Sequence, residues 1–457
     1  MIDESIFKAY DIRGIVGEGL SDNSILMIGK AIGSESINQN QKVISVGYDG
    51  RVSSPGISKI LIEGLLSSGI DVIDVGLVTT PMLYYSTYFL KTGTGVMITG
   101  SHNPPSYNGF KMVINNTTLS SMAIQQLKCR IINNDFNSGN GKKTTKNVSL
   151  DYKNHILDTV KLKRKMRIAI DCGNGAAGII AKKLFQELGA DVVALYDDVD
   201  GNFPNHHPDP SKPENLQELI EVVTNSECEI GLAFDGDADR LGVVNKNGEI
   251  IFPDRQLMLF AKSVLKDHPN QTIIFDVKSS RYLFDWIKAN NGNPLIWKTG
   301  HSLIKEKMKE TKSVLAGEMS GHTFFNDKWF GFDDGVYAGA RLLEILSHET
   351  LPIQEVLSNL PKGVSTPEIN IAVNEGEQHK IIQDLQNTAE FKDALEIIKI
   401  DGLRVEYPFG FGLMRASNTT PVIVLRFEAD SELNLTKIQS EFKSILSTKV
   451  RSEKIPF

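Results

Sequence analysis

Three stretches of the chain repeat one plan of strand, helix and strand, and this repetition constrains the fold more than any other feature. Each stretch opens with an apolar strand, continues with a segment of helical period and reaches a second short strand. The first strands are expected at residues 43–46, 167–170 and 272–275, the helices at 57–67, 177–188 and 281–289, and the second strands at 71–75, 191–195 and 294–297. This alternation predicts parallel α/β layers.

Later in each stretch, a further strand ends in a polar or charged loop. The three loops read T-G-S-H-N at residues 99–103, D-G-D-A-D at 235–239 and G-E-M-S-G-H at 317–322. Open α/β sheets bind ligands beyond the carboxyl ends of their strands. We therefore expect the three loops to converge on one site.

The C-terminal part breaks this plan and predicts a smaller α+β domain. It carries strand patterns at residues 368–373 and 421–427 and helix patterns at 378–386 and 433–446. A chain of 457 residues is also too long for one ordinary core. We predict three similar α/β domains with mixed sheets and a smaller C-terminal α+β domain around a central cleft, with bounds at 1–146, 147–250, 251–361 and 362–457. Residues 133–149, rich in Asn, Gly and Lys, are expected to be a linker or a long surface loop.

Composition excludes several classes of protein. No apolar run is long enough to span a membrane, and the first residues lack the basic and apolar regions of a secretory signal. Cys129, Cys172 and Cys228 are odd in number and widely spaced, which indicates reduced thiols and a cytoplasmic protein. A net charge of −7 argues against a nucleic-acid partner but allows an anionic small substrate. We expect neither a membrane nor an obligate protein partner.

Ser101 is the candidate nucleophile, on a tight and exposed loop between Gly100 and the Asn103-Pro104-Pro105 turn. A serine hydroxyl needs a base, a metal or prior modification to react. His102 and Lys111 are near in sequence, but their spacing matches no Ser-His-Asp order. On this stretch alone, an ordinary Asn-Pro turn remains open.

Asp235, Asp237 and Asp239 alternate with small residues and can turn toward one hard cation such as Mg²⁺. An EF-hand is excluded, because the sixth position of the loop is Arg240 instead of Gly and the twelfth is Lys246 instead of Glu. Without context, a solvated acidic turn would be the default interpretation.

The segment G-N-G-A-A-G at residues 173–178 follows a strand and opens a helix, with Asp197 and Asp198 about twenty residues on. It is the basis of a rival class, a nicotinamide-dependent oxidoreductase. We favour a glycine-rich packing turn, because the other two repeats have no such glycines and no second dinucleotide half is evident.

Taken together, the motifs resemble those of the α-D-phosphohexomutase family, from residue 8 to about residue 427. The match comprises K-A-Y-D-I-R-G at 8–14, T-G-S-H-N-P-P-S-Y-N-G-F-K at 99–111, D-G-D-A-D-R at 235–240, G-E-M-S-G-H at 317–322 and R-A-S-N-T-T-P at 415–421. The bacterial phosphomannomutase/phosphoglucomutase branch is the most similar. One departure is Tyr48, where the family's G-R-D-x-R turn has Arg.

The resemblance implies roles for matching residues. Ser101 would carry the phosphoryl group and, with Asp235, Asp237 and Asp239, bind Mg²⁺; Arg13 and Arg240 would also lie in the catalytic site. Glu318 and Ser320 would bind O3 and O4 of the sugar. The further substrate contacts would be Tyr10, Lys278, His301, Arg415, Ser417, Asn418 and Thr419. An Arg fork beside hydroxyls and an amide also suits a phosphate dianion.

The implied reaction interconverts hexose 1- and 6-phosphates of mannose and glucose through phosphoserine and a hexose 1,6-bisphosphate, which also serves as activator. Lys111 and His322 are the candidates for proton transfer, although an ordinary Lys stays protonated at neutral pH. The alternatives are glucosamine phosphate specificity, the oxidoreductase above and a non-catalytic sugar-phosphate binding protein.

Overall fold

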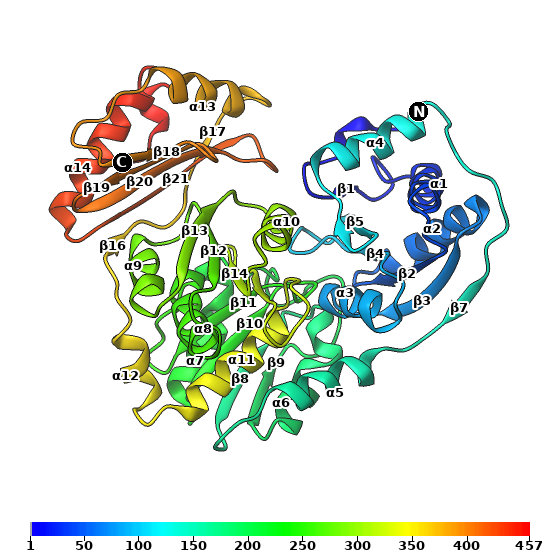
Figure 1. Cartoon of the computed structure of the whole chain (residues 1–457), viewed down its shortest axis with the longest axis horizontal. Helices are drawn as coiled ribbons and strands as arrows, with labels where there is room; N and C mark the ends of the chain where they lie inside the picture. The colour runs from blue at the N-terminus through cyan, green and yellow to red at the C-terminus, as the bar shows by residue number, and fades with distance from the viewer. Residues whose placement is uncertain (1) are drawn as a thin grey trace.

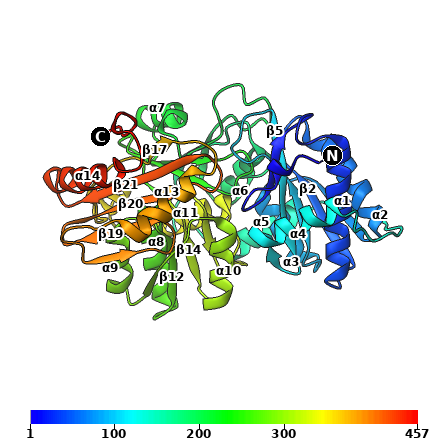
Figure 2. The same cartoon turned by 90° about the horizontal axis from the view of Figure 1, so that it is seen from above.

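The computed structural model describes residues 2–457 and confirms the predicted fold class, three α/β domains with mixed sheets and a smaller C-terminal domain. The first and fourth domains lie at opposite ends of the molecule, and the second and third lie between them (Figures 1 and 2).

The first domain is a seven-stranded sheet in the order β1-β5-β4-β2-β3-β7, with β6 paired to β5. Strand β2 runs parallel to β3 and β4, whereas β5 runs antiparallel to β4 and β1. The strands are β1 (Ile12–Ile15), β2 (Val43–Tyr48), β3 (Asp71–Leu77), β4 (Gly95–Ile98), β5 (Tyr107–Ile114), β6 (Thr117–Thr118) and β7 (Lys143–Thr145). The expected linker at 133–149 is therefore partly wrong, because β7 pairs with the free edge of β3.

The helices of the first domain are α1 (Asp22–Asn38), α2 (Ser54–Ser68), α3 (Thr80–Phe89) and α4 (Ser121–Ile132), after the short turn η1 (Glu4–Ile6). Helix α1 begins where the side chain of Ser21 accepts from the amide of Ser24, and α2 ends at Gly69 with a left-handed φ of 99°. The two helices approach closely because Gly29 and Gly64 face each other's backbone.

The second domain has a four-stranded sheet in the order β11-β10-β8-β9, with only β11 antiparallel. Its elements are α5 (Ser149–Thr159), β8 (Arg167–Asp171), η2 (Ala176–Ile179), α6 (Ala181–Glu187), β9 (Asp191–Leu195), η3 (Pro213–Leu216), α7 (Gln217–Asn225), β10 (Ile230–Phe234) and β11 (Leu241–Asn245). The single helix expected at 177–188 is thus divided into η2 and α6. The division follows from the contacts of the turn, because the amide of Ala176 donates to the carbonyl of Gly236 at 2.9 Å.

The third domain repeats this plan in the order β13-β12-β14-β15, with only β15 antiparallel. Its elements are α8 (Pro253–Asp267), β12 (Thr272–Asp276), α9 (Arg281–Ala289), β13 (Asn293–Trp297), α10 (His301–Thr311), β14 (Leu315–Gly317), β15 (Thr323–Phe325), α11 (Gly335–His348) and α12 (Ile353–Ser358). Helix α9 has the bounds expected from the sequence.

The fourth domain is an antiparallel sheet in the order β16-β21-β20-β19-β18, with β17 also on β21. Its elements are β16 (Val364–Ser365), β17 (Ile369–Ala372), α13 (Glu377–Thr388), β18 (Glu396–Ile398), β19 (Leu403–Tyr407), β20 (Gly410–Ala416), β21 (Val422–Ala429), α14 (Glu432–Leu446) and η4 (Ser452–Lys454). Within residues 2–457, no helix has both the length and the apolar character needed to cross a membrane.

One hydrophobic core runs through the second and third domains and includes one side of the first, whose remaining apolar residues form a separate core, and the fourth domain also has a core of its own. An aromatic cluster joins the three: the ring of Tyr85 lies 5.6 Å from that of Tyr152 and 5.8 Å from that of Trp329. These rings come from α3, from α5 and from the loop after β15, respectively. The shared core holds the first three domains in a fixed relation, which positions the loops at their strand ends.

Candidate active site

Ser101 lies on the turn between β4 and β5 with a left-handed φ of 50°. Its amide donates to Thr99 Oγ1 at 2.7 Å, and its hydroxyl donates to Asp235 Oδ2 at 3.2 Å. The expectation that this loop is exposed was wrong for Ser101, which is only 2% exposed. The loop after β10 covers it, because Gly236 packs against the carbonyl of Ser101 with no room for a Cβ atom.

Asp235, Asp237 and Asp239 follow β10 and are 0% exposed. One carboxylate oxygen of each lies within 4.8 Å of the others. Burial and the charges of the other two raise the pKa of Asp235 well above its ordinary value. Three buried carboxylates at this distance repel one another and need positive charge nearby.

Part of that charge comes from the protein. Lys111 Nζ, at the middle of β5, lies 2.7 Å from Asp237 Oδ2 and 2.5 Å from Asp239 Oδ2. Burial opposes the charged form of Lys111, but the two carboxylates raise its pKa well above the ordinary value. Arg240 adds a second cation, with Nε 3.8 Å from Asp235 Oδ2. Lys111 is therefore held as an ammonium.

Lys111 and Arg240 do not contact every carboxylate oxygen of the acidic loop. Oδ1 of Asp237 is buried and has no hydrogen-bond partner among residues 2–457, and Oδ1 of Asp239 faces only the imidazole Nε2 of His322, at 3.2 Å, within those residues. Carboxylate oxygens are the ligands that a hard divalent cation prefers. The acidic loop and the Ser101 hydroxyl beside it therefore fit a metal site.

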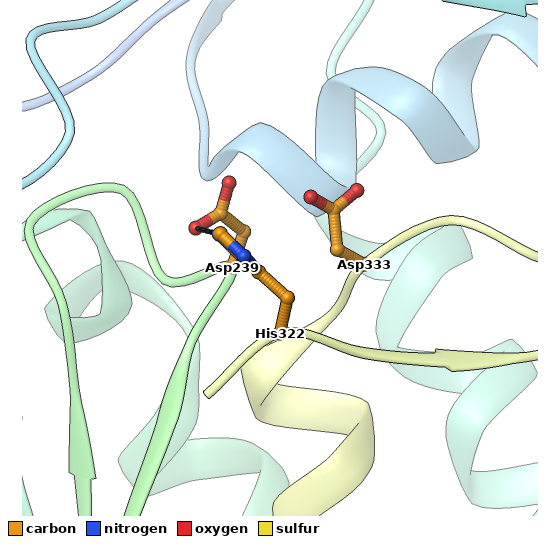
Figure 3. Close-up of side chains that lie close together, drawn as sticks. All are labelled: Asp239, His322 and Asp333. Atoms are coloured by element: carbon orange, nitrogen blue, oxygen red, sulfur yellow. Dashed lines mark ion pairs between the residues drawn. The ribbon is translucent and has the colours of Figure 1, made fainter. Parts of the chain in front are cut away.

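His322, just before β15, links this acidic loop to the third domain. Its Nε2 lies 3.2 Å from Asp239 Oδ1, and its Nδ1 lies 3.0 Å from Glu318 Oε2 and 2.9 Å from Ser320 Oγ. Figure 3 shows the imidazole directed at Asp239. Burial lowers the pKa of His322, but the charge of Asp239 and hydrogen bonds to both carboxylates raise it to about 9.

Asp333 lies on the other side of His322 (Figure 3) and was not predicted from the sequence. Its Oδ1 pairs with Lys305 Nζ at 2.9 Å, and its Oδ2 lies 3.6 Å from Nδ1 of His301. The rings of His301 and His322 are 5.7 Å apart. Nδ1 of His301 and Oδ2 of Asp333 are both buried and have no hydrogen-bond partner among residues 2–457.

A second group of predicted residues connects the first, third and fourth domains. The hydroxyl of Tyr10 donates to the carbonyl of Thr299 at 3.0 Å and accepts from the amide of Asn418. Arg415 Nε lies 3.0 Å from Asp401 Oδ2. Ser417 Oγ lies 3.4 Å from Thr419 Oγ1 in the same turn. These contacts form a polar set around Tyr10, distinct from the contacts of Ser101.

The two remaining predicted residues lie beside these groups. Arg13 Nη1 donates to Asn103 Oδ1 at 2.7 Å, on the turn that carries Ser101. Lys278 Nζ pairs with Glu368 Oε2 at 3.1 Å, between the third and fourth domains. The partners Asp401 and Glu368 were missed, because they lie outside the motifs and only the fold brings them close.

The glycine-rich turn at residues 173–178 packs against backbone. A Cβ atom at Gly175 would lie 2.9 Å from the carbonyl oxygen of Gly236, and one at Gly178 would lie 2.2 Å from that of Asp197. The glycines allow the turn to support the acidic loop, which agrees with the packing interpretation.

Comparison with known proteins supports one family along the chain. The phosphoglucomutase/phosphomannomutase models match in series: α/β/α domain I at residues 4–138, domain II at 150–248, domain III at 252–364 and the C-terminal domain at 368–445. The chain is 56% identical over 450 residues to a phosphoglucomutase of Neisseria meningitidis, covering 98% of each chain. It is 52% identical over 453 residues to the phosphomannomutase/phosphoglucomutase of Pseudomonas aeruginosa, covering 99% of this chain and 98% of the relative.

The fold also matches a solved structure. A phosphoglucomutase/phosphomannomutase family protein from Burkholderia thailandensis superposes with a TM-score of 0.94 at 49% identity, and the match covers 98% of each chain.

Proposed function

The chain belongs to the phosphoglucomutase/phosphomannomutase family, and we propose that it uses Ser101 to interconvert the 1- and 6-phosphates of glucose and mannose. It is an isomerase that acts by phosphoryl transfer. The observation that carries the proposal is the buried Ser101 hydroxyl 3.2 Å from Asp235, in contact with an acidic loop whose carboxylates pair with Lys111 and Arg240. The oxidoreductase alternative is not favoured, since the Gly173–Gly178 turn is occupied by packing.

In the proposed reaction, the bond between phosphorus and Oγ of phosphorylated Ser101 breaks as a bond forms to the free hydroxyl of a hexose monophosphate. The product of this step is a hexose 1,6-bisphosphate. The bisphosphate then turns over and returns its other phosphoryl group to Ser101. The first sugar oxygen loses a proton in the first step, and the second regains one in the return step.

We assign the transfer of protons to and from the sugar oxygens to His322 rather than to Lys111. Lys111 is held protonated by Asp237 and Asp239 and would instead stabilise negative charge. Mg²⁺ held by Asp235, Asp237 and Asp239 would offset part of their charge and of the charge on the transferred phosphoryl oxygens. Since the charge of Asp239 raises the pKa of His322, this offset would favour the neutral imidazole, which can accept a proton. Arg240 would hold the phosphoryl group on Ser101.

The other residues would bind and orient the sugar. Glu318 and Ser320 would take O3 and O4, and the loop of Arg415, Ser417, Asn418 and Thr419 would hold the phosphate that is not reacting. Tyr10, Lys278, His301 and Arg13 would complete the substrate contacts. The substrates are phosphosugars, and we place the enzyme in the cytoplasm, where its free Cys129, Cys172 and Cys228 would stay reduced.

The test is the phosphorylation state of Ser101 in purified protein, measured by intact mass and peptide mapping. Phosphate on Ser101 and turnover of glucose 1-phosphate are expected. Ser101→Ala should abolish turnover, whereas Ser106→Ala, at an exposed position of the same turn, should retain it. Unaltered turnover by homogeneous Ser101→Ala protein would refute the phosphoserine route. Binding of sugar phosphate without turnover would favour a binding protein.

A further inference from the structure

Arg51 lies in the Asp49–Gly50–Arg51 turn that follows β2, beneath the turn that carries Ser101. Its side chain is only 1% exposed. It belongs to the G-Y-D-G-R segment at residues 47–51, which departs from the family's turn at Tyr48.

The guanidinium of Arg51 donates to four carbonyls of one turn. Nη2 donates to Ser101 O at 2.8 Å and to Asn103 O at 2.6 Å. Nη1 donates to Pro104 O at 2.6 Å and to Tyr107 O at 3.0 Å. The turn contains Pro104 and Pro105, which have no amide hydrogens, so strand pairing cannot order it. The arginine supplies the donors that this backbone needs.

Asp49 fixes the arginine and the start of the turn together. Its Oδ2 lies 3.2 Å from Arg51 Nε and accepts from the amide of Gly100 at 3.3 Å. Its Oδ1 accepts from the hydroxyl of Ser54, at the start of α2, at 2.6 Å. The chain of contacts therefore runs from a rigid helix end to the residue before Ser101.

The second domain covers the outer side of the arginine. The ring of Phe203 lies 5.2 Å from the guanidinium carbon, and Gly201 packs against the backbone of Arg51 and Val52 with no room for a Cβ atom. Arg51 is thus enclosed between the Ser101 turn and the second domain.

We propose that Arg51 is the positioning residue of the phosphoryl-carrying serine. The inference rests on the proposed function of Ser101 and adds the group that holds it in place. Ser101 has a left-handed φ of 50°, which a non-glycine residue keeps only when its surroundings enforce it. Four hydrogen bonds from a planar fork enforce it here. A lysine has a compact ammonium with three donors and cannot reproduce that fork.

Arg51→Lys should therefore loosen the turn while leaving the sugar and metal contacts in place. A displacement of the reacting oxygen by about 1 Å can cost on the order of 100-fold in rate. We expect kcat on glucose 1-phosphate to fall by about 10- to 100-fold. The KM should stay within about threefold, because substrate binding is not removed.

Three measurements test the proposal. In the unchanged protein, the amides of Gly100, Ser101, Asn103 and Tyr107 should exchange hydrogen as slowly as a strand, and in Arg51→Lys they should exchange faster. In Arg51→Ala, millimolar guanidinium should restore part of kcat, whereas equal sodium chloride should not. Arg341→Lys is the matched control, because Arg341 is equally buried but pairs with Asp327 and not with the Ser101 turn. It should lower the melting temperature without changing exchange at these amides.

Several results would overturn the proposal. Arg51→Lys with parental kcat and parental exchange of the turn would do so. Fast exchange of the turn in the unchanged protein would do so even if every variant failed to fold. A loss of kcat that guanidinium does not restore in folded Arg51→Ala would leave only a structural role and would also refute it. If the unchanged protein turns over no hexose phosphate, the proposed function fails, while the exchange data still decide whether Arg51 orders the turn.

Discussion

Asp334 is a buried carboxylate, and its replacement by Asn should change how the free energy of unfolding depends on pH. It caps α11 by accepting from the amide of Tyr337 at 2.9 Å, and its two oxygens accept from the hydroxyl of Tyr152 at 3.0 and 2.9 Å. No Lys, Arg or His within residues 2–457 forms an ion pair with it. Burial raises the pKa of Asp334 from 3.8 to about 7, although these hydrogen bonds oppose the rise.

The direction of this pH dependence follows from proton binding. Between about pH 4 and pH 7, the native protein holds a proton on Asp334 that the unfolded chain has lost, so stability falls as pH rises through this range. At about 1.4 kcal/mol per pH unit, a rise from 3.8 to about 7 corresponds to about 4 kcal/mol. Asn keeps the acceptor oxygen for Tyr337 and does not titrate, so Asp334→Asn should avoid this loss.

We expect the free energy of unfolding of Asp334→Asn, relative to the parent, to be near zero at about pH 4 and to favour the variant by up to about 4 kcal/mol at about pH 8. Urea unfolding followed by tryptophan emission measures it, because Trp286, Trp297 and Trp329 all lie in the third domain with Asp334. Asp22→Asn, at the exposed start of α1, is the control for the loss of one carboxylate. A difference that does not vary with pH, or one that favours the parent at alkaline pH, would refute the reasoning.

The remaining predictions concern the active site. Asp237→Asn removes one charge from the acidic loop and should weaken Mg²⁺ binding by about 10- to 100-fold in a calorimetric titration; activity in metal-free protein that no divalent ion increases would contradict it. Arg415→Ala should impair both directions of the reaction. We also expect the fourth domain to close over the substrate, so scattering should show a more compact protein with glucose 1,6-bisphosphate than without it. Identical scattering curves would argue against this closure. Glu318 and Ser320 would contact sugar atoms that both epimers share, so kcat/KM for mannose 1-phosphate and glucose 1-phosphate should agree within about 100-fold. A thousand-fold preference would show that O2 is recognised.

Local patterns predicted most of the secondary structure. Helix α9 (Arg281–Ala289) and strand β9 (Asp191–Leu195) have the bounds expected from periodicity alone. The prediction of one helix at 177–188 was wrong because Ala176, just before it, donates its amide to the carbonyl of Gly236. Gly236 lies after β10, several elements further along the chain. Propensity describes a segment in isolation and gives no account of such contacts.

The sequence predicted which residues form the candidate site better than it predicted how deeply they are buried. The motifs located Ser101 and the three aspartates, but the burial of Ser101 comes from Asp235 and Gly236, and Asp235 is 134 residues further along the chain. Arg51 was not among the predicted site residues, because its contacts are with the backbone of the Ser101 turn, about 50 residues along the chain. Residues that order a catalytic loop carry no chemical signature of their own.

The division of the hydrophobic cores bears on how a bisphosphate could turn over. Part of the first domain shares a core with the second and third, and this core fixes the spacing of Ser101, Asp239 and His322. The fourth domain has its own core and joins the third through a small apolar cluster of Val277, Phe411 and Leu413 and through polar contacts, such as those of Arg404 with the carbonyls of Val277 and Ser279. Its contact with the first domain runs through the hydroxyl of Tyr10. A movement of the fourth domain would therefore free the distal phosphate while the acidic loop and Ser101 stay in place. An intermediate that must reorient requires this independent movement.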